Sequence, residues 1–446
     1  MDTASATFAA PYCLKNDEFT NHDLLRLARR AYSGVAVTNL LPRFLGRALQ
    51  RLPRLGLLAF ALVAGNSYAG PREQALQIHN RIAGVPPSEA VLAQMATEIS
   101  AGRVADAVRI AMSNEAFYSV TLKNLATPWT NRDRTVFAPL NDYTATVIGL
   151  VRDDADFRTA LYDNVLYTSN ASGLPSYSIA SNAHYEAIEA QGISLKDTLV
   201  RRDQSALNGI PADATSGVIT SRAAAKAFFI AGTNRAMFRF TLLNHLCRDL
   251  EQVHDASLTP DFIRQDVSRS PGGDSRVFLN NCIGCHNGMD PLAKAYAYYD
   301  YEFDVDADPD GLTGSIHYNT ESTIDPDTNS RVEKKYRINA NTFKYGYVTT
   351  NDEWQNYWRT GMNTHLGWSN ALPGRGAGAK SMNMELAHSQ AFASCQVEKV
   401  FKNVCLRKPA NQTDRDKLSE ITQDFASSGY KLKQVFIDTA DYCKGE

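Results

Sequence analysis

Apolar residues recur at helical spacing along most of the chain. In residues 73–84 they lie three and four positions apart, and the run ends at Gly84. Such spacing collects apolar side chains on one face of a helix. In residues 86–102 the same pattern follows Ser88, a residue type that commonly caps helix N-termini. The pattern therefore predicts two amphipathic helices at the start of the globular part.

The pattern continues through the chain with two interruptions, and it predicts a mainly α fold. Residues 165–215 are rich in Ser, Asn, Gly and Tyr, which indicates an irregular excursion. Residues 300–345 are polar and Asp-rich, with short strands expected at 314–319 and 334–348. Further helices are expected at 104–125, 142–167, 221–250, 351–361, 382–405, 413–429 and 430–443.

Composition narrows the class of partner. The 446 residues carry a net charge of −2, and the sequence pI is about 6.5. Nucleic-acid binding normally needs a basic surface, so no nucleic-acid partner is expected. Basic residues cluster only before residues 55–70, where a short apolar run ends in the small residues Ser67 and Ala69.

That cluster and apolar run have the layout of a secretory signal peptide. Cleavage is expected before Gly70, and the apolar run is shorter than the roughly 20 residues of a membrane-spanning helix. About forty residues precede the signal-like stretch, so we expect translation to start near Val35 or Val37. The exported chain would be periplasmic or secreted from a bacterium, with no transmembrane anchor after cleavage.

The cysteines fit export. Beyond residue 69 there are six, and four of them lie outside the sequence C-I-G-C-H at 282–286. Cys395 and Cys405 are ten residues apart on one expected helix, about 15 Å at 1.5 Å per residue, too far for a disulfide. If the last three helices run up, down and up, Cys405 meets Cys443. Cys395 is then left for Cys247.

The C-x-x-C-H sequence carries the main chemical signal. Cys282 and Cys285 are one helical turn apart and His286 follows directly. This is the attachment pattern of c-type haem, in which the thiols bond the porphyrin and the histidine binds iron. A zinc site would need a second pair of ligands, and a thioredoxin-like motif would need a βαβ unit. Neither is evident, so one covalent haem c is expected.

The residues around this sequence resemble one known family. The motif is followed by Met289-Asp290-Pro291-Leu292 and then Asp300, a pattern similar to that of planctomycete-type cytochrome c domain proteins. Residues 391–409 and 427–439 resemble the closing helices of that family. The resemblance covers 225–446 and, loosely, 75–125; Cys405 and the Asp-rich insert depart from it.

The signal-like stretch and the motif together suggest a domain division. Residues 1–69 would be an N-terminal extension plus signal peptide, and 70–240 a helical domain. Residues 241–446 would form a cytochrome c-like haem domain with a small β insertion and C-terminal helices.

A sixth iron ligand would separate electron transfer from catalysis, because a methionine closes the iron site. Met382 is the first candidate, since we expect it in a loop before the C-terminal helices. Met384 and Met362 are the alternatives. Met289 is on the motif helix itself and is expected to pack.

Three aspartates suggest a weaker second site. Asp306, Asp308 and Asp310, followed by Gly311, match the first half of a calcium loop. The twelfth position is His317 where such loops carry a bidentate glutamate. A solvated acidic turn is therefore favoured over calcium.

Three functions remain open. The first is an exported mono-haem cytochrome that carries single electrons between redox partner proteins. The second is a haem enzyme, peroxidase-like or oxidase-like, with an open distal site. The third is a haem-containing binding module in which the helical region grips a partner.

Overall fold

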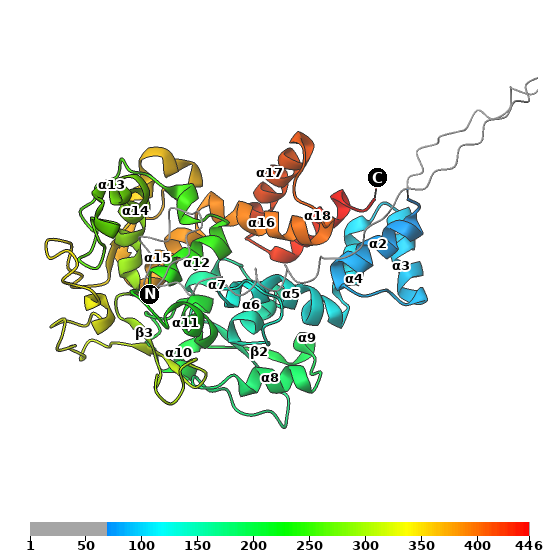
Figure 1. Ribbon diagram of the computed structural model, residues 1–446. Helices are drawn as coiled ribbons and strands as arrows, with labels where there is room; N and C mark the ends of the chain where they lie inside the picture. The colour runs from blue at the N-terminus through cyan, green and yellow to red at the C-terminus, as the bar shows by residue number, and fades with distance from the viewer. Residues whose placement is uncertain (1–68, 446) are drawn as a thin grey trace, which may run out of the picture. The chain divides into compact units, whose positions relative to one another are not determined.

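The computed structural model describes residues 69–445, and this part of the chain is mainly helical, which confirms the mainly α part of the expected fold class (Figure 1). The expected signal peptide, the upstream extension and the choice of translation start fall outside the described residues. The helices up to residue 246 are α2 (Pro71–Ala83), α3 (Glu89–Ser100), α4 (Val104–Met112), η1 (Phe117–Leu122), α5 (Lys123–Ala126), η2 (Thr127–Thr130), α6 (Asp142–Arg152), α7 (Thr159–Tyr162), α8 (Ala183–Ala190), α9 (Leu195–Thr198), α10 (Gln204–Asn208), η3 (Gly217–Thr220), α11 (Arg222–Phe228), α12 (Arg235–Thr241) and η4 (Leu242–Leu246).

Short helices and loops form the segment around the motif, and longer helices end the chain. These elements are η5 (Leu250–Val253), η6 (Pro271–Gly273), α13 (Ser275–Val277), η7 (Phe278–Cys282), α14 (Ile283–Ala293), η8 (Lys294–Tyr296), η9 (Lys334–Arg337), η10 (Tyr357–Arg359), η11 (Gly361–Leu366), α15 (Gly378–Ala387), α16 (Gln390–Cys405), α17 (Gln412–Ser427) and α18 (Leu432–Tyr442).

The first two helices end and begin where the sequence predicts. Gly84 terminates α2 in the left-handed conformation with φ 74°, a geometry that glycine adopts without strain. The Ser88 side chain accepts a hydrogen bond from the Val91 N–H and caps α3. Gly70, the expected first residue of the mature chain, directly precedes α2.

The helix expected at 221–250 is divided into three. Gly232 has φ 67° and Asn234 has φ 64°, and two left-handed residues so close together cannot continue a right-handed helix. The chain therefore turns between α11 and α12, and α12 passes into the π-helical turn η4. The turn allows Arg235 to begin a new helix that packs against α14.

Within residues 69–445 the strands form three separate two-stranded antiparallel sheets. The sequence reading is confirmed for one expected strand and is wrong for two other segments. The strand expected at 314–319 is present, but 334–348 forms η9 and turns. The helix expected at 351–361 is instead a strand, η10 and part of η11. The strand pairs are β1 (Leu166–Ser169) with β2 (Leu199–Arg202), β3 (Tyr299–Glu302) with β4 (Ser315–Tyr318), and β5 (Glu353–Gln355) with β6 (Arg375–Ala377).

The C-terminal helices carry both expected disulfides. Cys405 at the end of α16 is bonded to Cys443 directly after α18, and their Cα atoms are 5.5 Å apart. Cys247, which follows η4, is bonded to Cys395 in α16 with Cα atoms 5.3 Å apart. Both predicted pairings are confirmed. The single helix expected at 382–405 is broken before Ser389, whose side chain caps α16.

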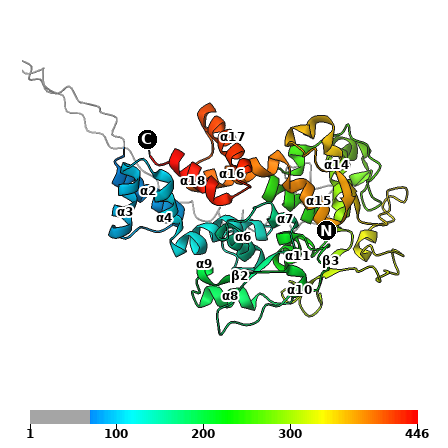
Figure 2. The ribbon, with the colours of Figure 1, turned by 180° about the vertical axis from the view of Figure 1, so that it is seen from behind.

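Segments from both sides of residue 240 pack against one another. Helix α15 packs on α7, and α18 packs on α4 and α2, so the red C-terminal helices lie beside the blue N-terminal ones in both views (Figures 1 and 2). One large hydrophobic core includes residues from both sides of residue 240. Within the described range, none of the helices combines the length and the apolar character that crossing a membrane requires.

Candidate haem-attachment site

The three residues of the motif lie on one side of the helix that carries them. Cys282 ends the π-helical turn η7, and Cys285 and His286 lie in the first turn of α14. At about 100° of rotation per residue, the three side chains leave the axis within an arc of about 100°. Gly284 and Gly288 each leave the axis about 160° from His286. The helix therefore has a cysteine–histidine face and a glycine face.

The imidazole of His286 is buried and oriented by a carboxylate. His286 is 1% exposed, and its Nδ1 lies 3.0 Å from Oδ1 of Asp290, one turn further along α14. Burial by itself raises the pKa of Asp290, but the charges of Arg235 and His286 hold that pKa well below its ordinary value. Asp290 is therefore ionised, and the Nδ1–H of His286 donates to it. The Nε2 atom is buried without a hydrogen-bond partner among the described residues.

Asp290 in turn belongs to a buried ionic cluster, which we call the arginine–aspartate relay: Arg235, Arg264, Asp266 and Asp290. Arg235 Nε donates to Asp290 Oδ1 at 3.0 Å. Its two terminal nitrogens donate to the Asp266 carboxylate at 2.8 and 3.0 Å. Arg264 also binds Asp266, at 2.8 Å. No side chain of the four is more than 6% exposed.

The glycine face is packed by two rings. A Cβ placed on Gly284 would lie 2.2 Å from the imidazole of His254, and one on Gly288 would lie 2.0 Å from the indole of Trp358. Trp358 is fully buried and packs against Phe238, with ring centroids 5.9 Å apart. Glycine at both positions is thus required for the rings to lie directly against the helix backbone.

The two cysteines have different surroundings. Cys282 is fully buried beside Ile263, Val267 and Phe278, and its sulfur is disulfide-bonded. Cys285 is a free thiol, partly exposed, whose Sγ lies 3.5 Å from the carbonyl oxygen of Leu250. Burial raises the pKa of Cys285 to about 12, so this thiol is protonated at neutral pH.

The candidate methionines are dispersed. Met382 lies within α15 rather than in a loop, which corrects the setting expected from the sequence, and it is fully buried in the main core. Met384 is on the same helix. Met362 is 64% exposed in η11. Met289 is fully buried on α14, as expected for a packing residue.

Element η11, which carries Met362, is connected to the motif helix through Asp255. Its Gly361 approaches the carboxylate of Asp255, and the Asp255 N–H donates to the Gly284 carbonyl oxygen at 3.0 Å.

The acidic loop shows no convergence of carboxylates. Asp308 accepts hydrogen bonds from the backbone and hydroxyl of Thr313, at 2.6 and 2.8 Å. Asp306 and Asp310 are exposed on the same loop. Among residues 69–445, no group of three or more His, Cys, Asp or Glu side chains is placed to hold a metal ion. Nothing in this loop adds support for calcium.

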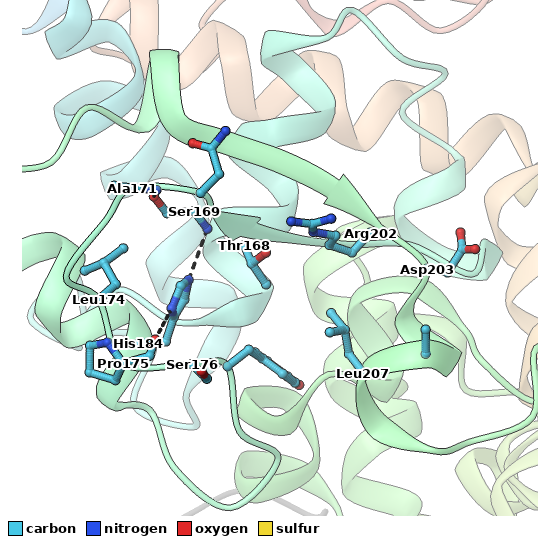
Figure 3. A pocket seen from close by; sticks show the side chains of 13 residues that line it. Thr168, Ser169, Ala171, Leu174, Pro175, Ser176, His184, Arg202, Asp203 and Leu207 are labelled. Atoms are coloured by element: carbon cyan, nitrogen blue, oxygen red, sulfur yellow. Dashed lines mark hydrogen bonds between the residues drawn. The ribbon is translucent and has the colours of Figure 1, made fainter.

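A pocket of ≈ 530 Å³ opens elsewhere, beside the β1–β2 sheet (Figure 3). Its histidine, His184, donates from Nδ1 to the carbonyl oxygen of Pro175 at 2.7 Å and accepts from the N–H of Ser169 at 3.0 Å. Both ring nitrogens are therefore engaged in holding the loop. None of Cys282, Cys285 and His286 lines this pocket, which is separate from the motif helix.

Sequence reasoning named the motif but missed the relay. Arg235 is 55 residues from Asp290 and 31 residues from Asp266. No local pattern links residues at such separations. The signal that could have suggested a partner is Asp290 itself, an acidic residue in the middle of an otherwise apolar helix turn.

Comparison with known proteins adds no relative. No family model, no curated protein and no solved structure matches this chain.

Proposed function

We propose that this protein is an exported mono-haem c-type cytochrome, with haem c bonded to Cys282 and Cys285 and His286 as the proximal iron ligand. The observation that carries the proposal is the state of His286. Its Nδ1–H is held by Asp290 while its buried Nε2 has no partner among the described residues. A metal-binding histidine is held in the same way, with one nitrogen on a carboxylate and the other on the metal.

The donor set fits a haem better than a free metal ion. One histidine and two cysteines on a single helical face are the ligands that haem attachment uses. A tetrahedral zinc site needs four ligands. A group of three or more candidate ligands is absent from the described residues.

Attachment requires both sulfurs as thiols. Each S–H adds across one vinyl double bond, so that sulfur bonds one carbon and the hydrogen goes to the other. Cys285 is already a thiol. Cys282, whose sulfur is oxidised in this structure, must first be reduced to a thiol, and a dithiol reductant supplies the two electrons for that step.

Single-electron transfer is the proposed role. A bound haem supplies reversible one-electron chemistry at its iron. The chain supplies His286, buries it, and leaves Cys285 partly exposed at the edge of the site. A redox partner protein would approach at this edge. Met382 is proposed as the distal ligand, with Met384 and Met362 as its alternatives.

The disulfides support the proposed export. Disulfides persist mainly in oxidising compartments, and the described residues contain two disulfides between cysteines 148 and 38 residues apart in the sequence. The proposed location is the periplasm or the exterior of a bacterial cell.

The test uses one tryptic peptide. Cleavage after Arg276 and Lys294 releases residues 277–294, which contain Cys282, Cys285 and His286 and no internal Lys or Arg. In the full chain expressed with cytochrome c maturation, this peptide should carry the mass of one haem. His286→Ala should abolish a stable haem spectrum, whereas His254→Ala, on the glycine face, should keep it. A wild-type peptide without haem, or with Cys282 still in a disulfide, would refute the proposal.

The rival function is a haem enzyme, and one observation favours it. A carboxylate hydrogen-bonded to the proximal histidine makes the imidazole a stronger donor, which stabilises oxidised iron. Carbon monoxide distinguishes the two functions. Binding of carbon monoxide to the reduced protein would show an open sixth position and favour the enzyme, while an unchanged reduced spectrum would favour the electron carrier.

A further inference from the structure

We propose that Arg235 is a positioning residue that sets the reduction potential of the site. It holds the Asp290 carboxylate in place and partly neutralises its charge, which weakens the hydrogen bond that Asp290 accepts from His286. This inference rests on the proposed haem at His286. It adds a control element that the C-x-x-C-H motif does not contain.

The contacts place Arg235 at the centre of the relay. It binds both carboxylates at once, Asp266 through Nη1 and Nη2 and Asp290 through Nε. Arg264 holds the far side of Asp266 and stacks over the ring of Tyr336 at 4.6 Å. Asp290 therefore cannot rotate away from His286 without breaking a buried ion pair.

The charges of the relay balance. Two guanidinium groups face two carboxylates, and burial leaves no solvent to screen a mismatch. Asp290 contacts both Arg235 and His286. Removing one charge from this cluster therefore changes the electrostatic potential at the imidazole of His286.

The two residues act on the iron in opposite directions. The Asp290 carboxylate attracts the Nδ1 proton, strengthens electron donation from Nε2 and favours ferric iron. Arg235 draws charge from the same carboxylate and weakens that effect. Removing Asp290 should therefore raise the reduction potential, and removing Arg235 should lower it.

The test is the midpoint potential of the haem-loaded full chain, measured by spectroelectrochemistry. We expect Asp290→Asn to raise and Arg235→Gln to lower the potential. Each change corresponds to about a tenfold shift in the one-electron equilibrium constant, or ~59 mV. Arg235→Lys retains the charge and should stay near the wild-type potential. Arg407→Gln, which breaks an ion pair with Asp414 in the C-terminal helices, is the matched control and should leave the potential unchanged.

A double variant separates the effect on the potential from misfolding caused by a buried unpaired charge. Arg235→Gln leaves one unbalanced carboxylate, whereas Arg235→Gln with Asp266→Asn restores the charge balance of the relay and still removes the partner of Asp290. The double variant should also lower the potential. Shifts of the same sign for Asp290→Asn and Arg235→Gln, or no shift in haem-loaded protein, would overturn this inference alone. A wild-type chain without haem would overturn the proposed function as well.

Discussion

Substituting alanine at the two glycines of α14 tests the packing behind the motif. In an ordinary helix interior Gly→Ala adds about 1 kcal/mol of stability, because alanine loses less backbone entropy. At Gly288 the new methyl would meet the Trp358 indole at 2.0 Å, and at Gly284 it would meet the His254 imidazole at 2.2 Å. The two clashes are similar, but the two rings differ in their freedom to move.

The Trp358 side chain cannot move aside. It is fully buried between α14 and Phe238, so the methyl at Gly288 must push apart packed elements, at a cost of roughly 1–3 kcal/mol. After the gain in helix propensity is subtracted from this packing cost, Gly288→Ala should destabilise the protein by about 1–2 kcal/mol. His254 is only partly buried and can swing towards solvent. Gly284→Ala should therefore be neutral or up to about 1 kcal/mol stabilising.

Urea unfolding followed by circular dichroism measures both variants against wild type. The midpoint should fall for Gly288→Ala and hold or rise for Gly284→Ala, with unchanged slopes. A Gly288→Ala protein as stable as Gly284→Ala would show that Trp358 is not wedged against the helix. The reasoning about the glycine face would then be wrong.

Three further outcomes are expected. Replacing Cys405 and Cys443 together by serine opens a loop of 38 residues, and loop entropy predicts a loss of roughly 4 kcal/mol in urea unfolding; a loss below about 1 kcal/mol would contradict that origin. Burial raises the pKa of Asp352 to about 6 from an ordinary 3.8, so this residue binds its proton more tightly when folded and its contribution to stability is lost as pH rises through that interval. Asp352→Asn should thus be more stable than wild type at pH 8 and equal to it at pH 4, and equal stability at both values would show that the carboxyl is not penalised by burial. Met382→Leu should allow carbon monoxide to bind reduced haem, with Met362→Leu as the inert control; if both variants behave like wild type, Met382 is not the ligand.

Local signals carried most of what could be predicted from the sequence. Gly84 and Ser88 determine helix ends by their own conformations and hydrogen bonds, so their roles could be predicted from nearby residues alone. The disulfide pairing could also be predicted, because helix geometry prevents Cys395 and Cys405 from meeting. That distance excludes one of the three possible pairings, and the up, down and up order of the last three helices selects between the other two.

Non-local contacts account for what the sequence reading missed. Residues 334–348 have strand-forming side chains, yet Tyr336 is buried against Arg264 and the segment turns to make that contact. The breaks at Gly232 and Ser389 fall inside runs that are apolar at helical spacing, where the periodicity hides them. The relay joins residues from three distant segments, and only the folded chain brings them together.

The disulfide between Cys247 and Cys395 has a consequence for biogenesis. Its two cysteines are 148 residues apart, and the motif cysteines lie between them in the sequence. Under the proposed export from the N-terminus, Cys247 would reach the oxidising compartment together with Cys282 and Cys285, long before its native partner Cys395. Premature oxidation would then join the wrong sulfurs. Under the proposed chemistry, haem attachment removes the thiols of Cys282 and Cys285, so neither can form a disulfide with Cys247. The cofactor would then act as a protecting group during oxidative folding. The yield of native protein would depend on whether haem attachment precedes disulfide formation.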